Sequence, residues 1–260
     1  MSQQRIYMRF SDYIQNTEII STSNVLRLFP TPQQAYNALS HAETTGKVER
    51  VRNGLYVSNS GRFRGAFVNP LKIASNATDD AVLAYSSAFR LITGSQDASY
   101  DIPFFTAKRM SRFNFRGYEF IPYAAPASET LKRNYYLTDG TTLIATTKEQ
   151  TIIDAVDAPW RCGGVEATLR RFSTIRYVDL KLLASLLADV SKSSIARLGW
   201  ILEHMKSQWS VDDGFLDKIN YAIGPGPYYF DRAKTRIDYD RRWKLYLPDT
   251  TLTIERWLHE

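Results

Sequence analysis

Cysteine and histidine are scarce in this chain. Its 260 residues include one cysteine, Cys162, and three histidines, His41, His204 and His259. A single thiol cannot form an intrachain disulfide, which favours a cytoplasmic location. That thiol also lacks the cysteine partners of a zinc cluster, and the histidines lie far apart along the sequence. We expect no metal site, and we identify no cofactor-binding or catalytic residue.

Long apolar runs are also missing. No stretch approaches the roughly 20 apolar residues that a membrane span requires. The first residues, MSQQRIYMRFSDYI, carry charges where a signal peptide needs an apolar run. We find no internal repeat, no coiled coil and no phosphate-binding glycine loop. A membrane partner is therefore not expected.

Positive charge is in excess and unevenly distributed. The formal net charge is +6, and the sequence pI is about 9.3. Up to Gly65 the chain has eight Lys and Arg residues but only four Asp and Glu residues. This balance fits a polyanionic partner for the N-terminal region.

Residues 31–46 have the pattern of a helix with a defined start and end. Thr31 suits the N-cap, Pro32 the first helical position, and Gln34 the reciprocal place in a capping box. Gly46 is typical of a helix end. The spacing i, i+3, i+4, i+7 predicts a buried stripe made of Ala35, Ala38, Leu39 and Ala42.

A small basic hairpin is predicted directly after this helix. Two β-prone runs, 47–51 and 55–57, flank Asn53 and Gly54, which both tolerate the positive φ of a tight turn. A helix followed by such a hairpin is the arrangement of a winged helix-turn-helix. The helix can lie in a major groove, while the hairpin arginines reach phosphates or the minor groove. Two further helices are predicted before it, over residues 5–15 and 24–29.

Polar and basic side chains of this region are the candidates for DNA contact. They are Arg27, Thr31, Gln33, Gln34, Asn37, His41, Lys47, Arg50, Arg52, Asn53, Arg62 and Arg64. The last two belong to residues 58–65, which form either a solvated linker or an arm that adds phosphate contacts. A helix with a hairpin also occurs in folds that bind no nucleic acid, and some winged helices contact proteins instead.

The complete chain is predicted to be α+β. A winged helix-turn-helix in residues 1–60 precedes a mixed α/β domain in residues 67–260, which is largely helical beyond about residue 177. Helices are predicted over residues 70–74, 79–93, 148–157, 178–190, 194–206 and 211–222, and from residue 253. Strands are predicted over residues 102–106, 116–123 and 143–146.

Two segments of the second domain alternate basic and aromatic residues. They cover residues 108–116 and 228–257. This composition is typical of surfaces that bind RNA or single strands. For the first segment, a hairpin with its aromatics inward and its cations outward is the favoured explanation. The second is a candidate surface for RNA, DNA or a protein partner.

Acidic and hydroxyl side chains of the same domain suggest an enzyme as an alternative. Glu149, Asp154, Asp157 and Glu166 could serve a metal-dependent nuclease, but no lysine is placed on a strand beside a carboxylate pair. Capping and surface roles are expected for these four. The adjacent pair Ser86-Ser87 has neither a nearby histidine nor a glycine elbow, so close helix packing is expected there.

Three segments resemble one known family. They are GKVERVRNGLYV at residues 46–57, AVLAYSSAF at residues 81–89, and KEQTIIDAVD with CGGVE at residues 148–166. They are similar to the wing, the start of the second domain and the signature helix of AbiEi-type antitoxins, the transcription-regulator half of type IV toxin–antitoxin systems. The resemblance weakens after Tyr177.

This resemblance implies a repressor that is not an enzyme. Its expected partners are double-stranded DNA, as inverted repeats in the promoter of its own operon, and a nucleotidyltransferase toxin encoded in that operon. The alternatives are a winged helix joined to a nuclease domain, or one joined to a protein-interaction domain.

Overall fold

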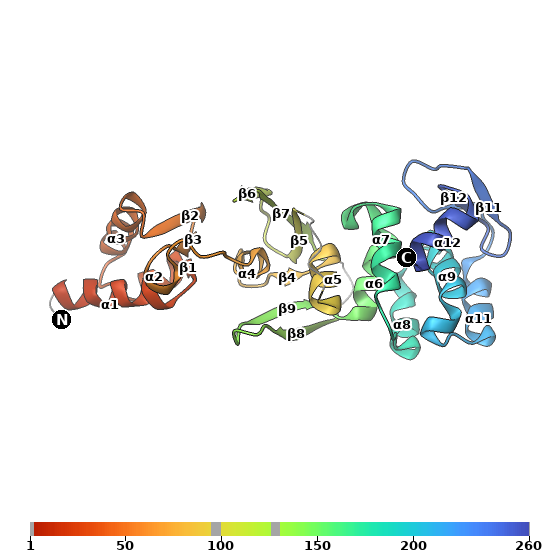
Figure 1. The fold of residues 1–260 in the computed structure, drawn as a ribbon, viewed down its shortest axis with the longest axis horizontal. Coiled ribbons are helices and arrows are strands. Elements are labelled where there is room, and N and C mark those ends of the chain that lie inside the picture. The colour runs from red at the N-terminus through yellow and green to blue at the C-terminus, as the bar shows by residue number, and fades with distance from the viewer. Residues whose placement is uncertain (1–2, 95–99, 126–130, 260) are drawn as a thin grey trace. The chain divides into compact units, whose positions relative to one another are not determined.

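The structure is a computed structural model that describes residues 3–94, 100–125 and 131–259 (Figure 1). Its class is mixed α/β, with helices and several sheets. The chain forms two compact units, which are Met1–Ala81 with Tyr100–Ala124, and Val82–Ser99 with Ala125–Glu260. Each unit therefore combines two separate stretches of chain. The domains expected from the sequence, 1–60 and 67–260, stay a prediction beside this division.

The first unit begins with helices and a three-stranded antiparallel sheet in the order β1-β3-β2. Its elements are α1 (Gln3–Asn16), β1 (Ile19–Ser21), α2 (Thr22–Leu26), α3 (Pro32–Thr44), β2 (Val48–Arg52) and β3 (Leu55–Ser58). Phe10 of α1 and Phe29 meet edge to face, with ring centroids 5.6 Å apart. Together with Ile14, Ile20 and Val25 they belong to the core that joins these helices to the sheet.

Helix α3 forms where the sequence predicts it. The Thr31 hydroxyl accepts a hydrogen bond from the Gln34 N–H (3.4 Å), and Pro32 occupies the first turn. All four residues of the predicted stripe are buried. The capping box is only half formed, because Gln34 Oε1 is buried and has no hydrogen-bond partner among the described residues. Gly46, with φ +67°, follows the helix end.

The helix before α3 is displaced from its predicted place. It spans Thr22–Leu26 rather than residues 24–29, and the Ser21 hydroxyl accepts the capping hydrogen bond from the Asn24 N–H. The residues before it form strand β1, which the sequence analysis did not predict. Ile20 of β1 is fully buried, and its strand pairs with β3.

The hairpin β2–β3 is present, but its turn differs from the prediction. Only Gly54 has a positive φ (+82°), whereas Asn53 does not adopt one. The pairing with β3 shifts register between Arg50 and Arg52, and this irregularity is typical of a β-bulge. The turn is therefore not the symmetric pair of left-handed residues that an Asn-Gly sequence suggests.

The first unit continues with a second group of strands. Its elements are the 3₁₀ helix η1 (Gly61–Phe63), α4 (Pro70–Ser75), β5 (Asp101–Thr106), β6 (Phe113–Phe115) and β7 (Tyr118–Ala124). β5 and β7 are parallel, and β6 pairs antiparallel with β7. Arg116 and Gly117 both have positive φ, so the β6–β7 turn is tight. Phe113 stacks on Phe120 with centroids 4.7 Å apart, while Arg112 is exposed, which matches the favoured hairpin.

Residues 79–93 do not form the single helix that was predicted. The Asp80 carboxylate accepts hydrogen bonds from the Thr106 hydroxyl (2.8 Å) and the Ala107 N–H (2.6 Å), at the end of β5. Asp80 is therefore tied to a strand end and caps no helix. The helix itself starts at Tyr85, and Gly94 ends it with φ +67° as expected.

The second unit contains helices and two groups of strands (Figure 1). Its elements are β4 (Val82–Leu83), α5 (Tyr85–Thr93), β8 (Lys132–Tyr136), β9 (Thr142–Thr146), α6 (Lys148–Asp157), η2 (Pro159–Cys162), α7 (Val165–Ser173), α8 (Leu180–Ser185), η3 (Leu186–Asp189), α9 (Lys192–His204), α10 (Lys206–Trp209), α11 (Asp213–Ile223), β10 (Tyr228–Tyr229), β11 (Asp238–Asp240), β12 (Leu245–Leu247) and α12 (Thr251–His259). β9 pairs parallel with β4 and antiparallel with β8. None of the described helices is both long and apolar enough to cross a membrane.

Helix α6 matches its predicted range, and Thr147 caps it by accepting the Gln150 N–H (3.3 Å). The helix predicted over residues 178–190 is instead divided into α8 and η3. Helix α7 and strand β8 were not predicted. The three-stranded sheet β10-β12-β11 was not predicted either.

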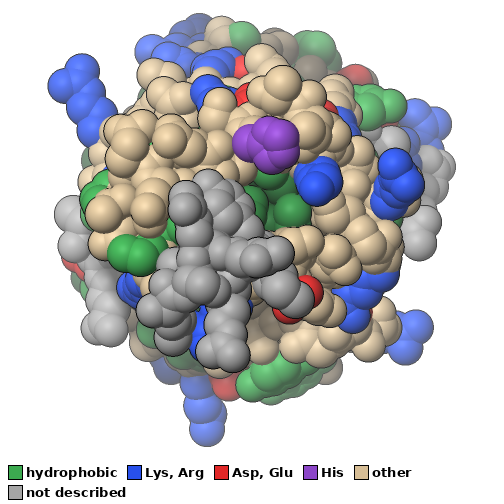
Figure 2. Space-filling view, turned by 90° about the vertical axis from the view of Figure 1, so that its left-hand side faces the viewer, with side chains coloured by type: hydrophobic (Ala, Val, Ile, Leu, Met, Phe, Trp, Pro, Cys, Tyr) green, Lys and Arg blue, Asp and Glu red, His purple; other side chains and the backbone are tan. Residues whose placement is uncertain are grey.

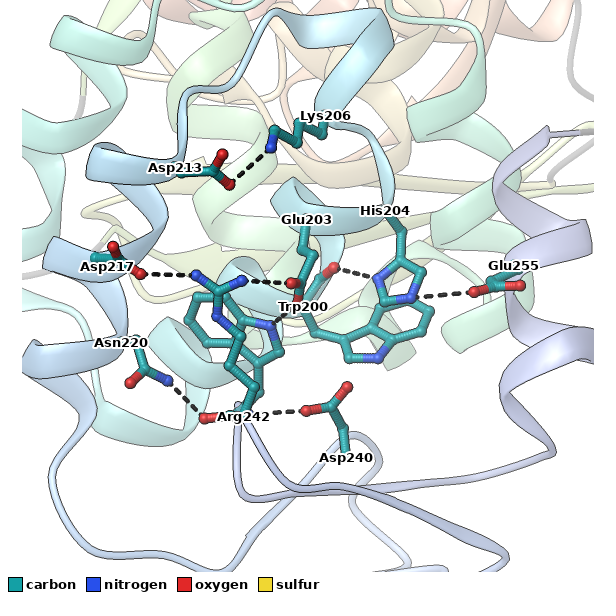
Figure 3. Close-up of polar contacts among 11 residues, drawn as sticks. Trp200, Glu203, His204, Lys206, Asp213, Asp217, Asn220, Asp240, Arg242 and Glu255 are labelled. Atoms are coloured by element: carbon teal, nitrogen blue, oxygen red, sulfur yellow. Dashed lines mark hydrogen bonds and ion pairs between the residues drawn. The ribbon is translucent and has the colours of Figure 1, made fainter.

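A polar network fastens the segment between β11 and β12 onto α9 and α11 (Figure 3). The Arg242 guanidinium donates to Glu203 (2.5 Å) and Asp217 (2.9 Å). The Trp243 indole N–H donates to the other oxygen of Glu203 (2.5 Å). The Trp243 ring is fully buried and lies directly against Gly199 of α9, where a Cβ would be 2.0 Å from Trp243 Cζ3. Glycine is therefore required at this crossing.

We expect Gly199→Ala to destabilise the protein by about 3 kcal/mol, because the added methyl group overlaps a buried ring. Urea unfolding of the full chain, followed by circular dichroism, measures this loss. The same substitution in a Trp243→Phe background should cost clearly less, because the smaller ring leaves room for the methyl group. Equal costs in both backgrounds would contradict the clash.

Candidate nucleic-acid interface

Helix α3 presents a polar face opposite its buried stripe. Gln33, Asn37 and Ser40 are exposed on it, and Gln33 Nε2 donates to Asn37 Oδ1 (2.9 Å). Such amide groups can pair with base edges in a major groove. The interaction between them orders both side chains before any ligand binds.

An aromatic residue on this face was missed by the sequence analysis. Tyr36 is 51% exposed, beside Asn37 and one turn from Gln33. The signal was available, because Tyr36 lies outside the i, i+3, i+4, i+7 stripe and so had to point away from the core. Its ring and hydroxyl extend the contact surface of α3 beyond the amides.

The two hairpin arginines both contact other side chains of the protein, and their predicted role in DNA contact stays a prediction. Arg50 pairs with Glu43 of α3 (2.7 Å), and its guanidinium lies 5.5 Å from the centre of the Tyr56 ring. Arg52 is partly buried, with its guanidinium 5.3 Å from the centre of the Phe113 ring. The hydrogen bond to Glu43 raises the pKa of Arg50, which keeps this side chain charged.

The wing also makes an ion pair with the second hairpin of its unit. Glu49 of β2 accepts from the Arg116 guanidinium at the β6–β7 turn (2.5 Å). Arg116 also donates to the Ala66 carbonyl (3.2 Å). Arg116 at the β6–β7 turn therefore lies against the wing.

Lys47 and Arg64 lie together, although seventeen positions separate them in the sequence. Both line a cavity of about 300 Å³ that is also lined by Ser11, Gln15, Gly46, Asn59 and Ser60. Neither cation has an ion-pair partner among the described residues. Two unpaired cations beside hydroxyl and amide groups can hold a phosphate.

Residues 58–65 are not a free linker. Asn59 donates to the Gly46 carbonyl (2.8 Å), Ser60 to the Lys47 carbonyl (2.9 Å), and Arg62 to the Asn16 carbonyl (3.3 Å). This segment is therefore folded back against α1 and the start of β2, as an arm of fixed position. Its cations, Arg62 and Arg64, are exposed.

The remaining candidates fall into two groups. Arg27, Thr31, His41 and Asn53 are exposed, so a ligand can reach them. Gln34 is partly buried, and its Oε1 is buried, so it is less accessible to a base than these four residues. Figure 2 views the side that carries α1 and α3, and Lys and Arg side chains outnumber Asp and Glu side chains on that face.

The four carboxylates considered for a nuclease serve separate elements. Glu149 accepts the Asp179 N–H (3.0 Å), Asp157 accepts the Ser194 hydroxyl (2.7 Å), and Glu166 pairs with Arg170 (3.0 Å). Within the described ranges, no three His, Cys, Asp or Glu side chains lie together as a metal site would require. Ser86 and Ser87 are buried, and their hydroxyls have no hydrogen-bond partner among the described residues. This agrees with the close helix packing expected there.

Asp154 is the exceptional carboxylate of this unit. It is buried in α6, Gln150 Nε2 donates to its Oδ1 (2.8 Å), and its Oδ2 has no partner among the described residues. Burial raises the pKa of Asp154 to about 7, although the Gln150 hydrogen bond opposes the rise. This carboxyl therefore keeps its proton to a much higher pH than an exposed aspartate does.

Comparison with known proteins does not identify a family. The chain matches no protein-family model, and a search of curated proteins found no significant relative.

The raised pKa of Asp154 makes stability fall as pH rises. The unfolded carboxyl ionises near 3.8 and the folded one near 7, so the folded state binds the extra proton between these values. Asp154→Asn, which keeps the acceptor for Gln150, should gain as much as about 4 kcal/mol relative to wild type between pH 4 and pH 8. Urea unfolding across this range measures the difference, and parallel pH profiles would contradict it.

Proposed function

We propose that this protein is a DNA-binding transcriptional repressor and that its N-terminal region is a winged helix-turn-helix. The order α1-β1-α2-α3-β2-β3 supports this proposal, with α3 as the recognition helix and β2–β3 as the wing. The observation that carries it is the exposed polar face of α3, which lies on the same compact region as the unpaired cations Lys47 and Arg64.

Sequence readout is assigned to the centre of that face. Gln33 and Asn37 offer amide groups suited to adenine, and Tyr36 adds an aromatic edge and a hydroxyl. Phosphate contacts are assigned to Lys47, Arg64 and the other exposed cations, which position the protein but carry no sequence information.

Arg50 is also assigned to phosphate contact, in which a DNA phosphate replaces Glu43 as its ion-pair partner. Its ion pair with Glu43 is exposed, with 47% and 34% of the two side chains accessible. Exposed ion pairs contribute only about 0–1 kcal/mol, so a phosphate can replace Glu43 at little cost. Arg52 contributes less, because its guanidinium lies on the Phe113 ring.

We further propose that the protein is the antitoxin of a type IV toxin–antitoxin system and is not an enzyme. This rests on the resemblance of residues 46–57, 81–89 and 148–166 to AbiEi-type antitoxins. Two of these segments belong to the second unit, where α5 and α6 are largely buried. The resembling residues of α5 and α6 therefore belong to the packed core. The surface that opposes a toxin lies among other residues.

The DNA proposal separates two kinds of variant. Gln33→Ala and Asn37→Ala should relax sequence preference, by about 1–3 kcal/mol for each base that the helix no longer reads. Lys47→Ala and Arg64→Ala should instead weaken binding to all sequences and lower the slope of log affinity against log salt by about one each. Electrophoretic shifts of the operon's own promoter against salt concentration measure both effects.

Two further variants serve as controls. Glu43→Gln frees Arg50 and should strengthen binding modestly. Lys218→Ala removes an exposed cation from α11 of the second unit and should leave binding unchanged. If the four interface variants and wild type bind alike, α3 is not the recognition helix. If wild type shows no salt-sensitive binding, a protein-interaction role for this fold is favoured instead.

The antitoxin role predicts rescue from a neighbouring toxin. A nucleotidyltransferase encoded beside this gene should arrest growth when expressed alone, and co-expression of the full chain should restore growth. A Lys47→Ala/Arg64→Ala variant should still restore it when expressed from an independent promoter, because these two cations are proposed to contact DNA and not the toxin. A different neighbour, or arrest that persists, would leave only the repressor proposal.

A further inference from the structure

The sheet β10-β12-β11 places three tyrosines in a row across its strands. Tyr229 lies opposite Tyr246 in the parallel pair, and Tyr239 lies opposite the same Tyr246 in the antiparallel pair. Directly paired residues share one face of a sheet. The ring centroids are 5.4 Å apart for Tyr229 and Tyr246, and 4.8 Å apart for Tyr239 and Tyr246. We call Tyr229, Tyr246 and Tyr239 the tyrosine row.

The tyrosine row lies on the solvent side of its sheet. Leu245 and Leu247, which alternate with Tyr246 along β12, are fully buried on the other face. Tyr239, on the outer strand, is 41% exposed. Tyr229 and Tyr246 are partly buried. A row of aromatic side chains on this face resembles the stacking platforms of sheet proteins that bind unpaired bases.

Cations lie directly on the rings. The Arg236 guanidinium is 5.4 Å from the centre of Tyr229 and 5.1 Å from that of Tyr246, and it donates to the Tyr229 hydroxyl (2.6 Å). The Lys234 ammonium is 5.8 Å from the centre of Tyr229. Both side chains are exposed, so their positive charge is available to an anion beside the row.

The acidic side chains near the tyrosine row accept hydrogen bonds from nearby groups of the chain. Asp231 accepts the Thr235 N–H (2.9 Å) and hydroxyl (2.6 Å), and Asp240 accepts the Trp243 N–H (2.9 Å). Asp238 accepts the hydroxyl and N–H of Thr251 at the start of α12, and these bonds lower the pKa of Asp238. These aspartates therefore stabilise the local backbone, whereas Lys234 and Arg236 are exposed to solvent.

The connection between β11 and β12 is held in place by polar contacts. Arg242 and Trp243 join the β11–β12 connection to Glu203, and Asn220 of α11 donates to the Arg242 carbonyl (2.5 Å) (Figure 3). Little further ordering of these strands is needed when a ligand binds, which favours binding by preorganisation.

We propose that the tyrosine row binds single-stranded nucleic acid. Unpaired bases stack on Tyr239 and Tyr246, and Arg236 and Lys234 contact the phosphates beside them. An aromatic row with exposed cations beside it complements a ligand that has both planar faces and negative charge. Duplex DNA hides its base faces by stacking, so this site is independent of the one on α3.

Fluorescence anisotropy of the full chain with labelled twelve-nucleotide oligomers, one of RNA and one of DNA, tests the proposal. Both should bind with an affinity that falls with salt. Tyr239→Ala and Tyr246→Ala should each weaken binding at least about fivefold, because each removes a stacking partner. Tyr239→Phe keeps the ring and should bind within about twofold of wild type. Binding of RNA alone would still support the site and would assign a role to the 2′-hydroxyl.

Tyr221→Ala is the matched control, because Tyr221 is 92% exposed on α11 and lies outside the row. It should bind like wild type, and duplex binding should be equal in all these variants. Photocrosslinking with a 4-thiouridine oligomer, followed by mass spectrometry, should label residues 228–247 in the unmodified protein. The proposal is overturned if neither oligomer binds saturably, if Tyr221→Ala weakens binding as much as Tyr239→Ala, or if crosslinks lie only outside this segment.

Discussion

Close packing of the short stripe on α3 decides which way this helix faces. Ala35, Ala38 and Ala42 are buried with Leu39 against the core that contains Phe10 and Phe29. Because three of these side chains are single methyl groups, the helix backbone lies near the core and its other face is left to solvent. The small side chains of the stripe therefore determine which face of α3 is exposed to solvent. The Thr31 cap determines the residue at which the helix begins.

Ion pairs moderate the cationic surface that results. Glu43 occupies Arg50, and Glu49 occupies Arg116. Each pair is exposed and weak, so it neutralises charge in the free protein but yields to a phosphate. A polyanion must bind these arginines more strongly than Glu43 and Glu49 do before it can replace them. Such a surface therefore disfavours weakly binding polyanions more than a surface of unpaired arginines would.

Local signals predicted those elements whose stabilising contacts are themselves local. Helix α3 is an example, since the cap formed by Thr31 acts within three residues. Contacts distant in sequence caused the failures. Asp80 resembled a helix start, yet its partner Thr106 is 26 positions away. The contact of Arg52 with the Phe113 ring could not be read from the local sequence, and neither could strand β1, which pairs with β3.

The alternation of the chain between its two units has a consequence for biosynthesis. The first unit needs Tyr100–Ala124, so it cannot be completed when residue 81 leaves the ribosome. It must wait for 43 more residues, of which 82–99 belong to the other unit. At about 5–20 residues per second this delay is roughly 2–9 s. During that interval the nascent wing lacks the Arg116 and Phe113 side chains that later support Glu49 and Arg52.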